Sequence, residues 1–160
     1  MPRPALLILL TAAFSAGCGN VITTETNGAS AMSLSRSGTL QLNLIVCSGS
    51  VGSLSLYGPH RGSESTPQKP LGSWLAKDPV TADALIDLDD PGPAWTMQRD
   101  PGRLQPAVVY SVLAGSRTED EELSQVDFSL DRLRRAPAGT VLYHDAEVVT
   151  ADSLRATVCD

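Results

Sequence analysis

Thr39-Leu-Gln-Leu-Asn-Leu-Ile-Val-Cys47 is the stretch that decides the fold. Leucines alternate with polar residues as far as Leu44, which is typical of a β-strand with one buried face. Ile45 and Cys47 then fall on the opposite face of the same strand. This break in the alternation predicts either a bulge near Leu44 or a strand end that is buried on both faces.

Further short strands are expected on both sides of this stretch. Val51–Tyr57 follows the turn signal Ser48-Gly49-Ser50 so closely that the two strands should form an antiparallel hairpin. Ala107–Ala114 is apolar on both faces, which predicts a central strand. The other expected strands are Ala31–Arg36 at a sheet edge, Trp95–Met97, Ser124–Leu130, Thr140–Val149 and Ser153–Cys159.

No long helix is expected between these strands. Val80–Leu88 fits either a helical turn or a strand, and Asp131–Arg135 fits a brief turn. Gly58–Gly72 contains so many prolines and glycines that it cannot be regular structure. The pattern predicts an all-β domain over residues 30–160, an antiparallel β-sandwich that is immunoglobulin-like in architecture only, since the usual mid-strand tryptophan is missing.

Composition limits the size of the fold and the class of partner. The chain has 160 residues, 42% of them hydrophobic, which suits one domain with a real core. Its formal net charge is −6, and no basic run occurs beyond Arg134-Arg135. This balance argues against a nucleic-acid partner, and it predicts a domain that stands off an anionic membrane surface.

The first residues have the features of an export signal. Arg3 is followed by the apolar run Ala5–Ala13 and then by the small residues Ser15-Ala16-Gly17. The apolar run is about half of the ~20 residues that a membrane-spanning helix needs. Residues 1–17 are therefore expected to be a cleaved signal peptide.

The end of this signal, Ser15-Ala16-Gly17-Cys18, resembles the bacterial lipobox, although leucine is usual at the first position. The resemblance implies cleavage after Gly17, a diacylglycerol on the thiol of Cys18, and a membrane partner reached through that anchor. It places the protein on the extracytoplasmic face of a bacterial cell membrane, with residues 18–29 as lipidated cysteine and tether. The alternative is an ordinary secretory signal followed by a chance cysteine. The chain as a whole is similar to small single-domain lipoproteins of actinobacteria that have no assigned activity.

Two cysteines remain once Cys18 is assigned to lipidation. Cys47 and Cys159 form an even pair in an oxidising compartment, which predicts a disulfide between an early strand and the last residues of the chain. The alternative is a pair of free buried thiols.

Candidate ligand-binding residues are sought in and around the Gly58–Gly72 loop, because rigid sandwiches present ligands to their loops. His60 and Arg61 lie in this loop, and Trp74 and Trp95 flank turn-rich segments. Exposed tryptophan is enriched at binding hot spots. The competing interpretation is that each tryptophan is a core residue that pins a loop.

No group of residues predicts catalysis, a metal or another cofactor. Asp145 follows His144 directly, and neighbours on a strand point to opposite faces, so the carboxylate cannot easily orient the imidazole. Asp145 and Glu147 would share a face of the strand, but a solvated edge strand explains them better than a metal site. Glu119–Glu122 lacks the spacing of a calcium loop and is expected to be a solvated acidic loop.

These observations favour a lipid-anchored binding or accessory protein of the cell envelope, with a protein or glycan partner. Two alternatives stay open at this point. One is an envelope hydrolase with an unrecognised site, which a deep pocket beside His144 would favour. The other is a structural subunit of a membrane complex, which an exposed apolar patch around Trp74 or Trp95 would favour.

Overall fold

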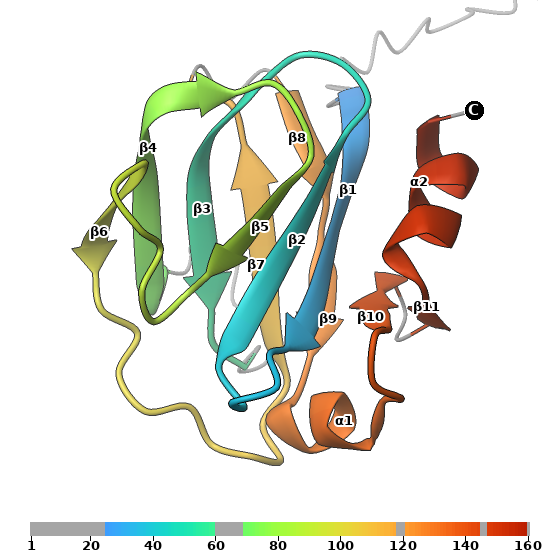
Figure 1. Ribbon diagram of the computed structural model, residues 1–160. Coiled ribbons are helices and arrows are strands. Elements are labelled where there is room, and N and C mark those ends of the chain that lie inside the picture. The colour runs from blue at the N-terminus through green and yellow to red at the C-terminus, as the bar shows by residue number, and fades with distance from the viewer. Residues whose placement is uncertain (1–24, 60–68, 118–120, 145–146, 160) are drawn as a thin grey trace, which may run out of the picture.

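The computed structural model describes residues 25–59, 69–117, 121–144 and 147–159, and these residues form mostly strands with two short helices (Figure 1). The elements in chain order are β1 (Glu25–Leu34), β2 (Leu40–Val46), β3 (Val51–Tyr57), β4 (Gly72–Val80), β5 (Ala84–Asp87), β6 (Trp95–Arg99), β7 (Tyr110–Gly115), β8 (Glu121–Ser124), β9 (Val126–Phe128), α1 (Leu130–Arg135), β10 (Val141–Tyr143), β11 (Glu147–Val149) and α2 (Ala151–Cys159).

The strands form one sheet in which β1 is central. Along one edge β1 pairs with β2, which pairs in turn with β5. Along its other edge β1 pairs with β8 and, further along, with the β10–β11 hairpin. From β8 the sheet continues through β7, β3, β4 and β6, while β9 extends the pairing of β7.

The sheet curls around a single main core, so that β2 and β5 lie in front of β3 and β7 in Figure 1. The inward side chains of β2 alternate as its sequence predicts, and they meet the inward side chains of the opposing strands. Burial of these apolar groups supplies the main driving force for folding. The largest fully buried side chains are Trp74, Phe128, Met32, Leu42, Leu44, Leu54, Leu56, Leu142 and Leu154.

A mostly β fold with a Cys47–Cys159 disulfide was predicted, and both features are confirmed. The sheet is mixed rather than wholly antiparallel, because β1 and β8 run parallel. The predicted hairpin between β2 and β3 is wrong. β1 and β5 occupy the two edges of β2, and the turn at Gly49, which has φ of 70°, carries the chain across the core to β3.

The break in alternation at the end of β2 reflects burial on both faces. The β1–β2 register runs without a shift from Gly28↔Val46 to Leu34↔Leu40, so the strand has no bulge. Ile45 points away from the main core into a second cluster, where it packs with Leu154 of α2. The strand is therefore covered on its outer face by a helix.

That covering helix, α2, replaces the strand that was predicted for Ser153–Cys159. Thr150 begins the helix, because its hydroxyl oxygen accepts a hydrogen bond from the Ser153 backbone N–H at 3.2 Å. Leu154 is the side chain that α2 buries, and Val158, one helical turn further on, packs against the same cluster. Leu154 and Val158 fit the period of two of a strand, but their spacing of four residues also places both on one face of a helix with a period of 3.6.

The first strand also differs from its prediction. β1 begins at Glu25, inside the expected tether, and ends at Leu34, and it is paired on both edges rather than lying at the edge of the sheet. At Gly28 in this strand, neighbouring groups approach too closely for a larger side chain. A Cβ at Gly28 would lie 1.9 Å from the carbonyl oxygen of Ile45.

Among the other predicted segments, some have the predicted structure and others differ from it. The predicted central strand is β7, which lies between β3 and the pair β8 and β9. Val80–Leu88 contains a strand, β5, rather than a helical turn. Thr140–Val149 is a two-strand hairpin, since Val141 pairs with Val149, and Asp131–Arg135 lies in helix α1. Glu121 and Glu122, expected in a loop, belong to β8.

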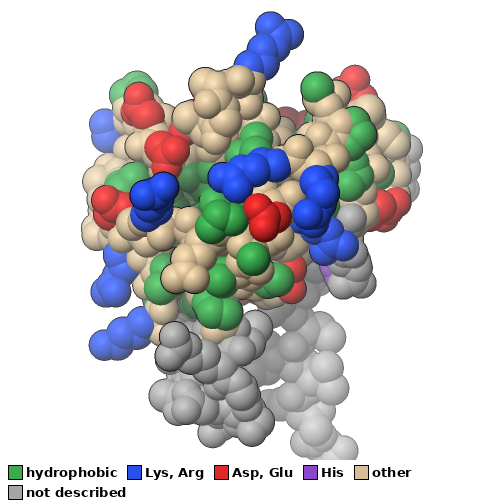
Figure 2. Space-filling model, turned by 90° about the horizontal axis from the view of Figure 1, so that it is seen from below, with side chains coloured by type: hydrophobic (Ala, Val, Ile, Leu, Met, Phe, Trp, Pro, Cys, Tyr) green, Lys and Arg blue, Asp and Glu red, His purple; other side chains and the backbone are tan. Residues whose placement is uncertain are grey.

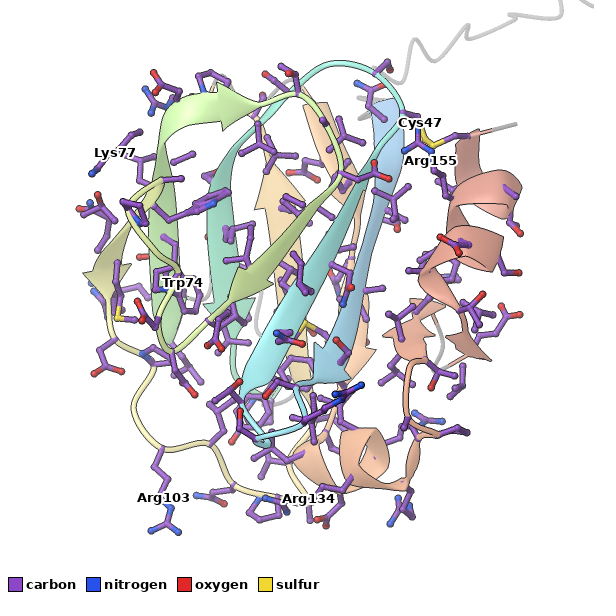
Figure 3. All side chains as sticks on the ribbon, viewed as in Figure 1. Cys47, Trp74, Lys77, Arg103, Arg134 and Arg155 are labelled. Carbon is purple, nitrogen blue, oxygen red and sulfur yellow. A yellow bond between two sulfur atoms is a disulfide. The ribbon has the colours of Figure 1, made fainter. Side chains whose placement is uncertain are left out.

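The disulfide joins the end of β2 to the end of α2 (Figure 3). Cys47 and Cys159 are 112 residues apart in sequence, and their Cα atoms are 5.2 Å apart. Beside it, Arg155 of α2 forms an ion pair with Asp83 at 2.5 Å. The bond therefore clamps the last helix to the sheet at the end where β1 begins.

Candidate functional site

The two ends of the domain are distinguished by where the first strand begins and where it ends. β1 begins at the upper end in Figure 1 and runs to Leu34 at the lower end, which we call the distal end. The distal end comprises the β1–β2 turn (residues 35–39), the connection between β6 and β7 (residues 100–109), α1, and residues 136–140 before β10. It lies opposite the point at which the chain enters the domain.

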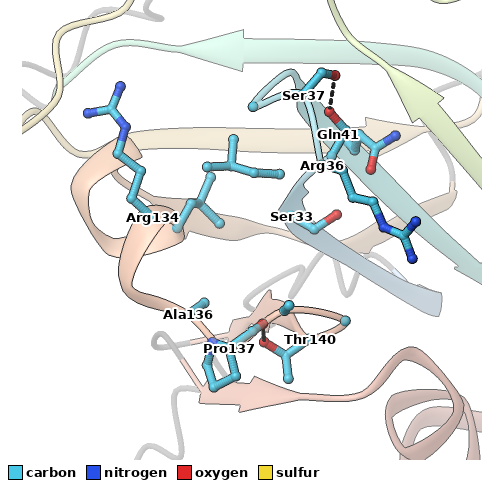
Figure 4. Close-up of a pocket in the computed structure, with 14 residues that line it drawn as sticks. Ser33, Arg36, Ser37, Gln41, Arg134, Ala136, Pro137 and Thr140 are labelled. Carbon is cyan, nitrogen blue, oxygen red and sulfur yellow. Dashed lines mark hydrogen bonds between the residues drawn. The ribbon is translucent and has the colours of Figure 1, made fainter.

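A groove of about 780 Å³ opens on the distal end between the β1–β2 turn and α1 (Figure 4). We call it the distal groove. Its walls carry two arginines, several hydroxyl groups and one amide, together with small apolar side chains. The residues that line it are Ser33, Leu34, Ser35, Arg36, Ser37, Gly38, Gln41, Leu133, Arg134, Ala136, Pro137, Ala138, Gly139 and Thr140.

Hydrogen bonds hold the β1–β2 turn that forms one wall of the groove. The Ser35 backbone N–H donates to the Thr39 carbonyl at 2.9 Å, and the Gly38 N–H donates to the Ser35 carbonyl at 3.0 Å. Gly38 has φ of 86°, which a residue without a Cβ adopts at little cost. Arg36 and Ser37 are exposed at the tip of this turn.

Helix α1 forms the opposite wall. Ser129 caps its start by accepting a hydrogen bond from the Arg132 backbone N–H at 3.3 Å. Leu133 is buried and anchors the helix, while Arg134 remains exposed at the groove. Its guanidinium lies 3.3 Å from Asp131, an exposed pair that contributes little to stability.

The charge of the distal end contrasts with the acidic charge of the whole chain. Arg36 and Arg134 line the groove, and Arg103 lies on the same end (Figure 3). In the view from below, basic side chains lie around exposed apolar and neutral surface, with acidic side chains between some of them (Figure 2). In a protein of net charge −6, this end is the part best suited to attract an anion.

Two smaller grooves lie elsewhere on the sheet. One, of about 220 Å³, separates β5 from α2 and includes Asp83 and Arg155, which are paired with each other. Another, of about 340 Å³, lies on the outer face of β3 and β7 and includes Tyr57 and Glu122. The distal groove is larger than either, and two arginines line it, Arg36 and Arg134, whose guanidinium groups extend to opposite sides (Figure 4).

The predicted ligand-binding residues fall in different places. Trp74 and Trp95 belong to the main core, with 1% and 7% of their surface exposed, so the core interpretation of both is the one the structure bears out. They do not form the exposed apolar patch that a structural subunit would present. His60 and Arg61 lie outside the described residues, as does the lipidation residue Cys18.

The residues considered for catalysis or metal binding do not form a site in the described part of the chain. His144 is exposed after β10, with its ring centroid 5.9 Å from that of Tyr143. Asp145 lies outside the described residues, and Glu147 is in β11, so the single strand that would have put these carboxylates on one face does not exist. Among described side chains, no group of three or more His, Cys, Asp or Glu residues could hold a metal ion.

No protein-family model, curated protein or solved structure matches this chain. Among the described residues, no helix is long and apolar enough to cross a membrane. The groove residues Arg36, Ser37, Gln41 and Arg134 were not candidates from the sequence. One signal in the sequence could have found part of the groove. Ser129 before Leu130-Asp131-Arg132 indicates a helix start, and such a helix would have placed basic residues in one helical turn.

Proposed function

We propose that this chain is a lipid-anchored binding protein of the bacterial cell envelope, and that its ligand occupies the distal groove. The observation that carries the proposal is the position of the groove, at the end of the domain opposite the entry of the chain. The likeness of Ser15-Ala16-Gly17-Cys18 to a lipobox supplies the anchor. An anchor at one end and a groove at the other leave the groove accessible to envelope material.

The dimensions of the chain support this orientation. Only residues 19–24 separate Cys18 from the start of β1, and an extended chain of that length reaches about 25 Å at most. β1 then carries the chain about 30 Å further, at about 3.3 Å per residue. A short tether thus holds the entry end near the membrane and directs the groove away from it.

In this proposal the curled sheet serves as an immunoglobulin-like scaffold that presents its connections at one end. Connections on a rigid sheet commonly carry binding residues. The Gly58–Gly72 segment follows Tyr57, where β3 ends, and leads to Gly72, where β4 begins, and both of these strand termini point toward the distal end in Figure 1. His60 and Arg61 stay candidate contacts on the ground of the sequence alone, because they lie outside the described residues.

The anchor is tested with the full chain expressed in its native host. The unmodified protein should be in the membrane fraction, with an intact mass equal to residues 18–160 plus a diacylglycerol. Cys18→Ser should move it to a soluble extracytoplasmic fraction, because two acyl chains anchor stably and none anchors at all. A Cys18→Ser protein that stays in the membrane fraction would contradict the anchor.

The groove is tested by co-sedimentation of detergent-solubilised protein with insoluble envelope material. The double variant Arg36→Gln/Arg134→Gln should sediment much less than the unmodified protein. Lys77→Gln is the matched control, because Lys77 is exposed at the other end of the domain (Figure 3) and loses one positive charge. Equal sedimentation of all three proteins would remove the groove from the proposal.

A further inference from the structure

The hydrogen bonds behind the β1–β2 turn determine what the distal groove offers to a ligand. They begin at Asp87 of β5, whose Oδ2 accepts a hydrogen bond from the Thr39 hydroxyl at 2.8 Å. The other oxygen of Asp87 accepts from the backbone N–H groups of Asp89 and Asp90, at 3.0 and 3.3 Å. A carboxylate can only accept, so the direction of the Thr39 hydrogen bond is determined.

The direction of the Thr39 hydrogen bond determines the donor in two further hydrogen bonds, which involve two serines. Thr39 Oγ1 lies 2.6 Å from Ser35 Oγ, and since the single Thr39 proton already goes to Asp87, Ser35 must donate. Ser35 Oγ lies in turn 2.7 Å from Ser37 Oγ, and since the Ser35 proton is used, Ser37 must donate. All three hydroxyl protons point toward Asp87. The exposed Ser37 oxygen therefore presents only lone pairs, as an acceptor.

The other polar groups of the groove have the opposite or a mixed character. The guanidinium groups of Arg36 and Arg134 are donors only and are always charged. The Gln41 amide can both donate and accept. A ligand that satisfies this groove carries anionic oxygens for the arginines and hydroxyl donors for Ser37.

We propose that the ligand of the distal groove is a polyhydroxylated anion, a saccharide or polyol chain that carries carboxylate or phosphate groups. This inference rests on the proposed function and specifies the chemistry of its ligand. A peptide partner would bind through an apolar anchor in a fully desolvated pocket. The apolar side chains of this groove lie beside hydroxyl, amide and guanidinium groups, and none of the described residues that line it is aromatic.

The charge balance explains why the arginines matter. A chain of net charge −6 repels an anionic polymer, so an encounter depends on the local field of Arg36 and Arg134. Both side chains are exposed, and at about 0.15 M salt the field of an exposed charge falls off within about 8 Å. Binding should therefore weaken steeply as the salt concentration rises.

The ligand class is tested with lipidated full-length protein in a neutral detergent and four soluble probes of similar length. Alginate supplies hydroxyls and carboxylates, and poly(glycerol phosphate) supplies hydroxyls and phosphates. Dextran supplies hydroxyls alone, and poly-glutamate supplies carboxylates without hydroxyls. Binding of alginate, poly(glycerol phosphate) or both at least about tenfold tighter than dextran and poly-glutamate is the expected result, from charge-assisted hydrogen bonds combined with the Ser37 acceptor.

The pattern of binding also identifies the anionic group, because preference for one of the first two probes separates carboxylate from phosphate. Equal binding of poly-glutamate would overturn the proposal in favour of an acidic peptide. Equal binding of dextran would overturn the anionic part, and binding of no probe would overturn the ligand class.

Single substitutions distinguish the contacts of the two arginines with the anionic groups from the contact of Ser37 with a hydroxyl group. Arg36→Gln and Arg134→Gln should each weaken binding of the anionic polyols about fivefold to tenfold, while Lys77→Gln leaves it unchanged. Ser37→Ala should weaken binding of the anionic polyols about threefold and leave poly-glutamate binding unchanged, because it removes only the acceptor. An unaltered probe preference in Ser37→Ala would overturn the acceptor role.

The sedimentation experiment distinguishes failure of this inference from failure of the proposed function. If no soluble probe binds but sedimentation still depends on Arg36 and Arg134, the ligand chemistry is wrong and the groove remains the binding site. If sedimentation does not depend on these arginines, the groove itself is not the site.

Discussion

The two ends of the β1–β2 pair are held together in different ways. At the entry end, a covalent bond from Cys47 ties α2 over the sheet, and Leu154 of that helix packs with Ile45 of β2. At the distal end, a hydrogen-bonded turn presents the exposed Arg36 beside a groove. We therefore expect the entry end to contribute most to stability and, under the proposed function, the distal end to bind the ligand, so substitutions at the two ends should have separable effects.

The largest expected effect is removal of the disulfide at the entry end. Cys47→Ser/Cys159→Ser should lower the free energy of unfolding by at most about 4–5 kcal/mol, because the bond closes a loop of 112 residues. Urea unfolding of the variant and of the unmodified protein, with and without a reductant, measures the loss. Reductant should destabilise only the unmodified protein, and indifference of both proteins to reductant would contradict the role of the bond.

The next largest effect compares one glycine from each end. Gly28→Ala should cost about 3 kcal/mol, because φ of 146° is unfavourable for alanine and its Cβ would lie 1.9 Å from the Ile45 carbonyl oxygen. Gly38→Ala should cost only about 1 kcal/mol, since φ is 86° but nothing lies within 4 Å of the added Cβ. Thermal unfolding of both variants checks the difference, and equal losses would break the contrast between the ends.

Truncation of the buried side chain of α2 should cost slightly less than Gly28→Ala and more than Gly38→Ala. Leu154→Ala is expected to lower the free energy of unfolding by about 2–3 kcal/mol, because Leu154 is 2% exposed and fills the second cluster. Thr157→Ala, on an exposed position of the same helix, should change it by less than about 0.5 kcal/mol. Denaturant unfolding of both variants measures the pair, and similar costs would mean that α2 is not anchored through Leu154.

A smaller effect on stability is expected at the distal end, from the start of α1. Ser129→Ala removes the N-cap hydrogen bond to Arg132 and should cost about 1 kcal/mol. Because α1 positions Arg134, the same variant should also weaken sedimentation with envelope material. A loss of stability without a change in sedimentation would separate α1 from the groove.

The smallest effect on stability is expected from the groove arginines. Arg36→Gln/Arg134→Gln should change the free energy of unfolding by less than about 0.5 kcal/mol, because both side chains are exposed and the Asp131 pair is weak. The same variant should show the largest loss of binding. A loss of several kcal/mol in the double variant would contradict the separation of the two ends, because it would show that the distal end also contributes to stability.

Local sequence patterns predicted those strands in which the apolar residues of the pattern are the ones that the tertiary structure buries. The alternation of Leu40, Leu42 and Leu44 predicted β2, and the apolar run of Ala107–Ala114 predicted a central strand near β7. The same alternation misassigned Ser153–Cys159, since Leu154 and Val158 fit a strand and a helix equally well over so short a segment. β1 was placed too late because Gly28, Ala29 and Ser30 contain little apolar surface, although Ala29 and Ser30 are fully buried.

The candidate site was much less predictable than the fold. Arg36 and Arg134 are exposed residues far apart in sequence, and nothing in the local pattern around either marks a ligand site. The acceptor role of Ser37 depends on Asp87 of β5, and β2, β3 and β4 lie between the two residues in the chain. Trp74 and Trp95 looked more distinctive as residues, yet both serve the core.

The sequence by itself determined the mostly β character and the availability of one cysteine pair, while the export signal and its likeness to a lipobox stay predictions. These properties follow from residue type and local spacing. Only the tertiary structure decided that β2 pairs with β1 and β5, that the last segment is a helix, and that a basic groove lies at the distal end. The physical reason is that strand pairing, helix packing and charge clustering depend on contacts between residues distant in sequence, which local patterns do not encode.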